Sequence, residues 1–280
     1  MGEVSLVFGQ RQDLLGTLCL PRREGAAAFG VVLFNAGMLH RIGPNRVQVK
    51  LARALAARGL PSLRFDLHGL GDSARADGRL AHGAQVLEDL RDALDALQAH
   101  AGVEGCGVLG FCSGIVSSYR LAEVDARVRS LVLYDGFDLI STSSRVRYYF
   151  SRLRQHGFGR IGLAHYRRRA RLLGHALALR LAGGGSASVD EHGDLSVARL
   201  LEGLAALSAR GVQVTLINAG SAYGVHDGQA QMRAALDRRG ARAVRAIFLD
   251  EVDHLLTPLA AQHAFIDVVG EAFDAGPQPT

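Results

Sequence analysis

The sequence predicts an α/β fold in which a mostly parallel central sheet is covered by helices on both faces. Short apolar runs alternate with amphipathic helical patterns along most of the 280 residues, which is typical of parallel strands joined by crossover helices. Residues 30–37, GVVLFNAG, form a continuous apolar run that suits a strand buried on both faces. Hydrophobic residues make up 48% of the chain, which is enough for a sizeable core.

The first half of the chain begins with an expected antiparallel pair at residues 3–10 and 14–20, joined by a polar turn. After the strand at 30–37, a helix is expected from Pro44 to about Arg58, because proline suits the first helical turn and Gly59 suits the position after the last. Strands and helices then alternate: strand 61–67, helix 84–100, strand 107–112 with a helix directly after it, and strand 128–136.

Residues 137–193 interrupt this alternation, because no strand-like apolar run occurs among them. We predict that they form a helical cap inserted into a core made of residues 1–136 and 194–280. Alternation resumes with helix 195–210, strand 212–220, helix 228–239, strand 242–250 and helix 257–273. Ligands of such sheets bind beyond the carboxyl ends of the strands, so the residues that follow each strand are the candidates for function.

Composition and charge exclude several classes of protein. The formal net charge is +5 and Lys50 is the only lysine, yet no basic run is interleaved with aromatic residues, which argues against nucleic-acid binding. The three cysteines have neither disulfide-framework nor zinc spacing, which indicates a reducing compartment. The N-terminus does not resemble a signal peptide, and no run approaches the roughly 20 apolar residues of a membrane helix. A cytoplasmic protein without a membrane partner is expected.

The strongest chemical signal is the run from Gly110 to Gly114, GFCSG, between a predicted strand and a predicted helix. A sharp strand-to-helix turn strains its central residue and needs small residues two positions away on either side. Glycines flank Cys112 at those positions, whereas Ser113 would be flanked by large side chains. We therefore predict Cys112 as a nucleophile whose thiol pKa is lowered by the start of the helix. Cys19 and Cys106 lack such a context and are predicted to be buried core residues.

A histidine follows the last predicted strand, in the run DEVDH that ends at His254. A side chain at this strand end can reach a nucleophile at the end of another strand, so His254 is the best of the 11 histidines for a general base.

With these residues, the sequence resembles the α/β-hydrolase fold family over nearly its whole length. The resemblance depends on the elbow GFCSG, on FDLHGLGDS at residues 65–73, on the inserted segment and on the late turn DHLL at 253–256. The cysteine at the elbow is similar to dienelactone hydrolases. The runs NAGMLHRIGPNR at 35–46 and LRFDLHGLGDS resemble the small hydrolases associated with the exosortase system.

The resemblance implies an oxyanion hole made of two backbone N–H groups, here those of Ser113 and Met38. It also implies an acid that orients the histidine. The order nucleophile, acid, histidine favours Asp227, although the acid of the family usually follows its strand more closely, near Tyr223. Asp135, at the end of the strand at 128–136, is the alternative, and the absence of an acid is a third interpretation.

Other residues near the predicted strand ends are candidates for substrate contacts. His40, Arg46 and Tyr223 are the candidates, whereas solvated loop side chains are the plainer interpretation of the first two. In the resemblance Asp66, Asp72 and Ser73 serve loop architecture and not catalysis.

The sequence therefore predicts an acyl hydrolase that attacks an ester, thioester or lactone through an acyl-cysteine, with Cys112, His254 and Asp227 as its triad and with no metal or organic cofactor. One alternative is an acyltransferase or thioesterase-type tailoring enzyme that passes the acyl group to an amine or alcohol. The other is a catalytically silent binding protein. The expected partner is a small acyl substrate, and a carrier-bound substrate and a homodimer are left open.

Overall fold

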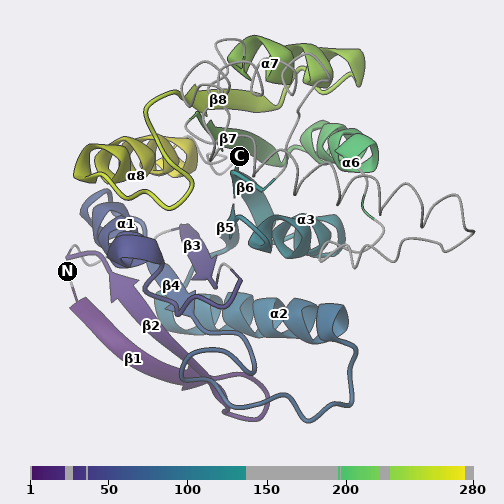
Figure 1. Ribbon diagram of the computed structural model, residues 1–280. Coiled ribbons are helices and arrows are strands. Elements are labelled where there is room, and N and C mark those ends of the chain that lie inside the picture. The colour runs from purple at the N-terminus through teal and green to yellow at the C-terminus, as the bar shows by residue number, and fades with distance from the viewer. Residues whose placement is uncertain are drawn as a thin grey trace, which may run out of the picture. The chain divides into compact units, whose positions relative to one another are not determined.

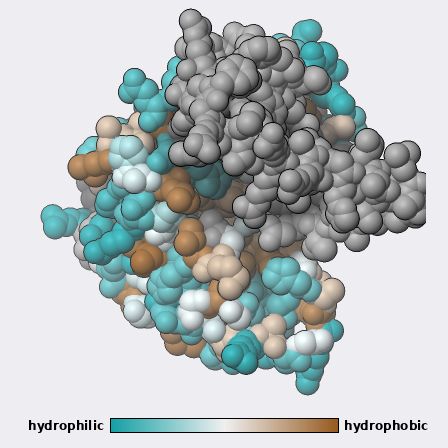
Figure 2. All heavy atoms as spheres, viewed as in Figure 1, coloured by the Kyte–Doolittle hydropathy of each residue, from teal (hydrophilic) through white to brown (hydrophobic). Residues whose placement is uncertain are grey.

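The computed structural model describes residues 2–22, 28–35, 37–136, 195, 197–220 and 228–274. All of these except residue 195 belong to one compact unit formed by Met1–Leu139, Ser196–Ala222 and Gly228–Thr280. The predicted cap at 137–193 lies outside the described residues. Among the helices that are described, none combines the length and the apolar character needed to span a membrane. The face shown in Figure 2 carries mostly hydrophilic side chains with small, separate apolar groups between them.

An eight-stranded sheet forms the centre of the described unit, with the order β1-β2-β4-β3-β5-β6-β7-β8 (Figure 1). β1 pairs antiparallel with β2 and β2 antiparallel with β4, and the remaining neighbours are parallel. This confirms the predicted mostly parallel sheet and its initial antiparallel pair. The strands are β1 (Gly2–Phe8), β2 (Leu14–Leu20), β3 (Phe29–Phe34), β4 (Ser62–Phe65), β5 (Gly105–Phe111), β6 (Val128–Tyr134), β7 (Gln213–Ala219) and β8 (Arg245–Leu249).

Helices cover both faces of this sheet, as the alternating pattern predicts. α1 packs against α8 on one face, and α2, α3 and α6 lie next to one another on the other (Figure 1). The helical elements are η1 (Pro44–Arg46), α1 (Val47–Ala57), α2 (His82–Ala101), α3 (Gly114–Val124), α6 (Val197–Ala209), α7 (Gly228–Arg238) and α8 (Leu259–Asp274).

The core divides at the sheet because side chains alternate between its two faces. Phe111 of β5 and Tyr134 of β6 belong to the apolar cluster that includes α1 and α8. The residues directly before them, Gly110 and Leu133, are buried on the other face, where Gly110 lies against α3. Burial on both faces explains why these strands read as continuous apolar runs in the sequence.

The strand predicted at 30–37 is shorter in the structure, because it ends at Phe34. The side chain of the next residue, Asn35, leaves the sheet pattern and satisfies loop groups instead. Its amide donates to the Leu39 carbonyl at 2.6 Å and to Asp66 Oδ1 at 2.8 Å, and its Oδ1 accepts from the Leu67 N–H at 2.6 Å. A buried polar side chain therefore sets the point at which the chain turns towards the site.

The helix predicted from Pro44 also begins later, since regular α-helix starts at Val47. Asn45 and Arg46 have φ values of 49° and 60°, in the left-handed region that residues other than glycine seldom adopt. In this conformation the Asn45 amide donates to the carbonyls of Leu255 at 3.0 Å and Leu256 at 3.3 Å. The turn before α1 is thus joined to the loop that carries His254.

Gly110 gives a direct test of the packing around β5. A Cβ at this position would lie 2.8 Å from Ser118 Oγ, 2.9 Å from Leu133 Cδ2 and 3.0 Å from the Ile115 Cα. We expect Gly110→Ala to lower the free energy of unfolding by about 1–3 kcal/mol, because α3 must shift away from the sheet. Urea denaturation measures the loss.

The matched control is Gly2→Ala in β1, where a Cβ would meet nothing within 4 Å. Its unfolding midpoint should equal that of the wild-type protein. A Gly110→Ala variant as stable as Gly2→Ala would contradict the close approach of α3 to β5.

Candidate active site

The predicted elbow is a sharp turn in the structure. β5 ends at Phe111, Cys112 has a φ of 52°, and α3 begins at Gly114. The Cys112 N–H donates to the Tyr134 carbonyl at 2.8 Å, and the Cys112 carbonyl accepts from the Ile115 N–H at 3.2 Å. A non-glycine residue in this region costs on the order of 1–3 kcal/mol. The two hydrogen bonds fix the strained residue, whose side chain is half-buried.

A carboxylate stands beside the elbow, at the end of the neighbouring strand. Asp135 follows β6, and its backbone is also left-handed, with a φ of 49°. Its N–H donates to the Ile217 carbonyl at 2.9 Å, and its Oδ1 accepts from the Ala219 N–H at 3.2 Å. Strand β7 therefore fixes both the backbone and one carboxylate oxygen of Asp135.

The His254 ring lies between this carboxylate and the thiol. Its Nδ1 is 2.7 Å from Asp135 Oδ2, and the ring is close enough to Cys112 to lower the pKa of its thiol. Since Asp135 takes Nδ1, the nitrogen that faces the sulfur is Nε2. The rings of Tyr134 and Phe111 support the imidazole, with Tyr134 stacked at a centroid distance of 6.5 Å. The Cys112, His254 and Asp135 side chains thus form one connected row.

The loop that carries His254 is held from three elements. The Tyr134 hydroxyl donates to the Asp253 carbonyl at 3.0 Å, and the Asp253 carboxylate accepts from the Thr257 N–H at 2.7 Å. The Asn45 amide holds the carbonyls of the two residues after His254, and the Gln262 amide also reaches one of these at 2.9 Å. These contacts explain why a histidine after an edge strand can be placed accurately.

The interaction between His254 and Cys112 changes the pKa values of both side chains. The hydrogen bond from His254 lowers the pKa of the Cys112 thiol, although burial acts against it, and the N–H of Ser113 lowers it further. Hydrogen bonds to Asp135 and Cys112 raise the pKa of His254 to about 10. A lowered thiol pKa beside a raised imidazole pKa favours a thiolate paired with an imidazolium.

The thiol pKa values of the other two cysteines shift in the opposite direction from that of Cys112. Burial raises the pKa of the Cys106 thiol to about 12 and also raises that of Cys19. Both are buried, as the sequence predicts, and both remain neutral thiols near neutral pH. Cys112 is the activated cysteine of the three.

The predicted oxyanion groups lie next to the elbow. The Ser113 N–H directly follows Cys112 and lowers the pKa of its thiol. The loop after β3 reaches the same place, because the Gly37 N–H donates to Ser113 Oγ at 2.8 Å. Met38 follows, and its side chain points into solvent with 88% of its surface exposed.

The predicted substrate residues have different environments. His40 makes loop contacts, because its Nδ1 accepts from the Ile42 N–H at 3.3 Å and its Nε2 lies 3.2 Å from Asp72 Oδ2. Arg46 is exposed at the start of α1. Tyr223 and Asp227 lie outside the described residues.

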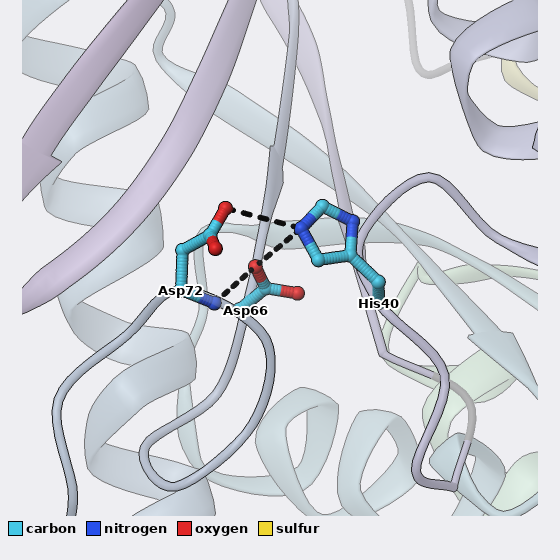
Figure 3. Close-up of side chains that lie close together, drawn as sticks. All are labelled: His40, Asp66 and Asp72. Atoms are coloured by element: carbon cyan, nitrogen blue, oxygen red, sulfur yellow. Dashed lines mark hydrogen bonds and ion pairs between the residues drawn. The ribbon is translucent and has the colours of Figure 1, made fainter.

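Three potential metal ligands converge beside the loop after β3. Figure 3 shows His40 and the carboxylates of Asp66 and Asp72 directed at a common point. The guanidinium of Arg41 occupies that point: its NH1 contacts Asp66 Oδ2 and lies 2.7 Å from Asp72 Oδ2 and 2.9 Å from His40 Nε2. The donor set is thus satisfied by an arginine cation, and the cluster ties the loop after β3 to the loop after β4.

Comparisons with known proteins identify the fold. No family model and no curated protein sequence matches the chain. Among solved structures, a dienelactone hydrolase from Anabaena variabilis has a TM-score of 0.57 at 17% identity and is matched over 99% of each chain. The esterase domain of a Rhodothermus marinus protein has a TM-score of 0.58 at 16% identity, with 97% of this chain and 98% of that chain covered.

A serine hydrolase without a lid from Xanthomonas campestris is also similar, with a TM-score of 0.56 at 14% identity over 100% of this chain and 96% of its own. These similarities, together with the strand order and the elbow, show that the chain has the α/β-hydrolase fold. The fold implied by the sequence resemblance is confirmed.

The Asp66 cluster leads to a stability prediction. Asp66 is fully buried and accepts hydrogen bonds from the Arg41 guanidinium and backbone N–H, from Asn35 and from the Asp72 N–H. Asp66→Ala leaves Arg41 with the half-exposed Asp72 as its remaining carboxylate partner and removes the acceptor of three further donors, so we expect it to lower the free energy of unfolding by about 3–5 kcal/mol in urea denaturation. Asp77→Ala removes an exposed pair with Arg11 and should change stability little. Equal losses in the two variants would refute this role of Asp66.

The ion pair leads to a second prediction. In the wild-type protein, the pH midpoint of Cys112 alkylation by iodoacetamide should lie below 9, the ordinary thiol value. In His254→Ala the midpoint should move to higher pH, because burial still disfavours the thiolate and the imidazole no longer stabilises it. Cys112→Ala provides the background from the buried thiols. An unchanged midpoint in His254→Ala would contradict the ion pair.

Proposed function

We propose that the protein is an acyl hydrolase that uses Cys112, His254 and Asp135 as a catalytic triad. One observation carries the proposal: the imidazole of His254 is held at Nδ1 by Asp135, 2.7 Å away, and acts on Cys112, whose thiol pKa it lowers. This is the arrangement of nucleophile, base and orienting acid that acyl transfer requires. In this proposal the acid is Asp135, the alternative of the sequence analysis, in place of Asp227.

The first half of the reaction forms an acyl-cysteine. The Cys112 thiolate attacks the carbonyl carbon, a carbon–sulfur bond forms, and the carbonyl electron pair moves to oxygen. The N–H groups of Ser113 and Met38 would stabilise this oxyanion. His254 then gives its Nε2 proton to the leaving oxygen or sulfur as that bond breaks. Asp135 holds the ring in place through Nδ1 during the transfer.

The second half returns the protein to its starting state. Neutral His254 takes a proton from water, whose oxygen attacks the acyl carbon. Collapse of the tetrahedral intermediate expels the Cys112 thiolate and releases the carboxylic acid. The imidazolium and thiolate are then paired again, so protons and charges balance over the cycle.

Two features support an ester, thioester or lactone as substrate. The similar solved structures include a dienelactone hydrolase and an esterase domain, whose names describe this type of carbonyl compound. Large apolar side chains are exposed on the loops after β3 and before α8, namely Met38, Leu39, Ile42 and Leu255. They favour a substrate with an apolar part near its carbonyl group.

The nucleophile can be tested by intact mass. After addition of acyl thioesters and activated esters, we expect an acyl adduct on Cys112 or turnover, and both should be absent in Cys112→Ala. Added amines or alcohols compete with water for the adduct, so the product ratio distinguishes a hydrolase from an acyltransferase. Turnover that persists in Cys112→Ala would rule out the assigned nucleophile.

The acid can be tested by comparing two substitutions. Asp135→Asn should lower kcat/KM by about 10²-fold or more, because the amide no longer orients or charges the imidazole. Asp227→Asn should retain most of the activity. The opposite result would assign the acid to Asp227 and leave Asp135 as a structural residue.

A further inference from the structure

The Ser113 side chain does not cap the helix that follows it. It is the residue before the first turn of α3, where serine usually accepts a hydrogen bond from an N–H of its own helix. No such capping bond is made by the Ser113 side chain. Its hydroxyl oxygen instead accepts the Gly37 N–H at 2.8 Å, from a loop 76 residues earlier in the chain. The hydroxyl therefore serves the loop after β3 and not the helix.

The contact with Ser113 lies in the middle of the loop after β3, between two anchored ends. Asn35 is anchored at one end by Asp66 and the Leu39 carbonyl, and Arg41 is anchored at the other end by the same carboxylate. Between these anchors, Gly37 has no side chain and that of Met38 is almost fully exposed. Among the described residues between Asn35 and Arg41, it is therefore the N–H of Gly37 that connects the loop to the elbow.

The conformation of Gly37 supports the same conclusion. Its φ of 55° lies in the left-handed region, which glycine adopts at little cost. The resulting turn directs the Gly37 N–H at Ser113 and places the next N–H, that of Met38, directly after the contact. A shift of this turn would move the Met38 N–H relative to the sulfur of Cys112.

We propose that Ser113 is a positioning residue, whose hydroxyl fixes the oxyanion loop against the nucleophile elbow by accepting the Gly37 N–H. The inference rests on the proposed acyl chemistry at Cys112, in which the Ser113 and Met38 N–H groups bind the oxyanion. Ser113 thus acts twice: its backbone binds developing charge, and its side chain sets the distance to the second donor. Oxyanion donors contribute to catalysis only when they are already in place before charge develops.

The test compares two reactions of the same thiol in Ser113→Ala and Ser113→Thr. Acetylation of Cys112 by p-nitrophenyl acetate develops an oxyanion, whereas alkylation by iodoacetamide displaces iodide from a saturated carbon and develops none. In Ser113→Ala we expect the acetylation rate constant to fall about tenfold, less than the 10²–10³-fold loss of a whole donor. The alkylation rate and its pH midpoint should equal those of the wild-type protein. Ser113→Thr keeps the hydroxyl and should acetylate at close to the wild-type rate.

Each other outcome has a distinct meaning. Unchanged acetylation in Ser113→Ala would overturn the positioning role. Equal losses of acetylation and alkylation would also overturn it, because the hydroxyl would then act on the thiolate and not on the loop. Failure of the wild-type protein to become acetylated at Cys112, with Cys112→Ala as the reference, would instead refute the proposed function.

Discussion

The parallel pairing of β5 with β6 is the constraint on which the site depends. Phe111 and Tyr134 are opposite each other in this register, so the residues that follow them, Cys112 and Asp135, emerge side by side at the same sheet edge. The two aromatic rings point to the α1 and α8 face and support the imidazole of His254. A shift of one residue in this pairing would turn one of the rings to the other face and separate the thiol from the carboxylate.

Much of this arrangement follows from local sequence signals. Apolar runs and helical periodicity predict the sheet and its helices, and the small residues around Cys112 predict the elbow, because the steric demands of a sharp turn act over a few residues. The position of the proposed acid depends on long-range packing. Asp135 reaches His254 because β7 fixes its backbone and its Oδ1, and neither contact leaves a local pattern. Chain order therefore favoured Asp227, which lies outside the described residues.

The loop after β3 could also not be predicted in detail. The left-handed Asn45 and Arg46 replace the expected first helical turn, because the Asn45 amide bonds to carbonyls more than 200 residues away. The signal that could have been used is the buried acid of FDLHGLGDS, since a charge inside the core requires a cationic partner. Arg41 pairs with Asp66 and thereby fixes the far end of the loop that reaches the elbow.

The proposed triad draws its members from regions of unequal stability. Cys112 and Asp135 end central strands, whereas His254 follows β8, the outermost strand, whose residues are only partly buried or exposed. Edges of a sheet open at a lower free-energy cost than its centre. Warming should therefore fray β8 and withdraw the imidazole while the rest of the sheet is intact, so that reactivity disappears before the fold does. The contacts of Asn45 and Tyr134 to the His254 loop set how far apart those two temperatures lie.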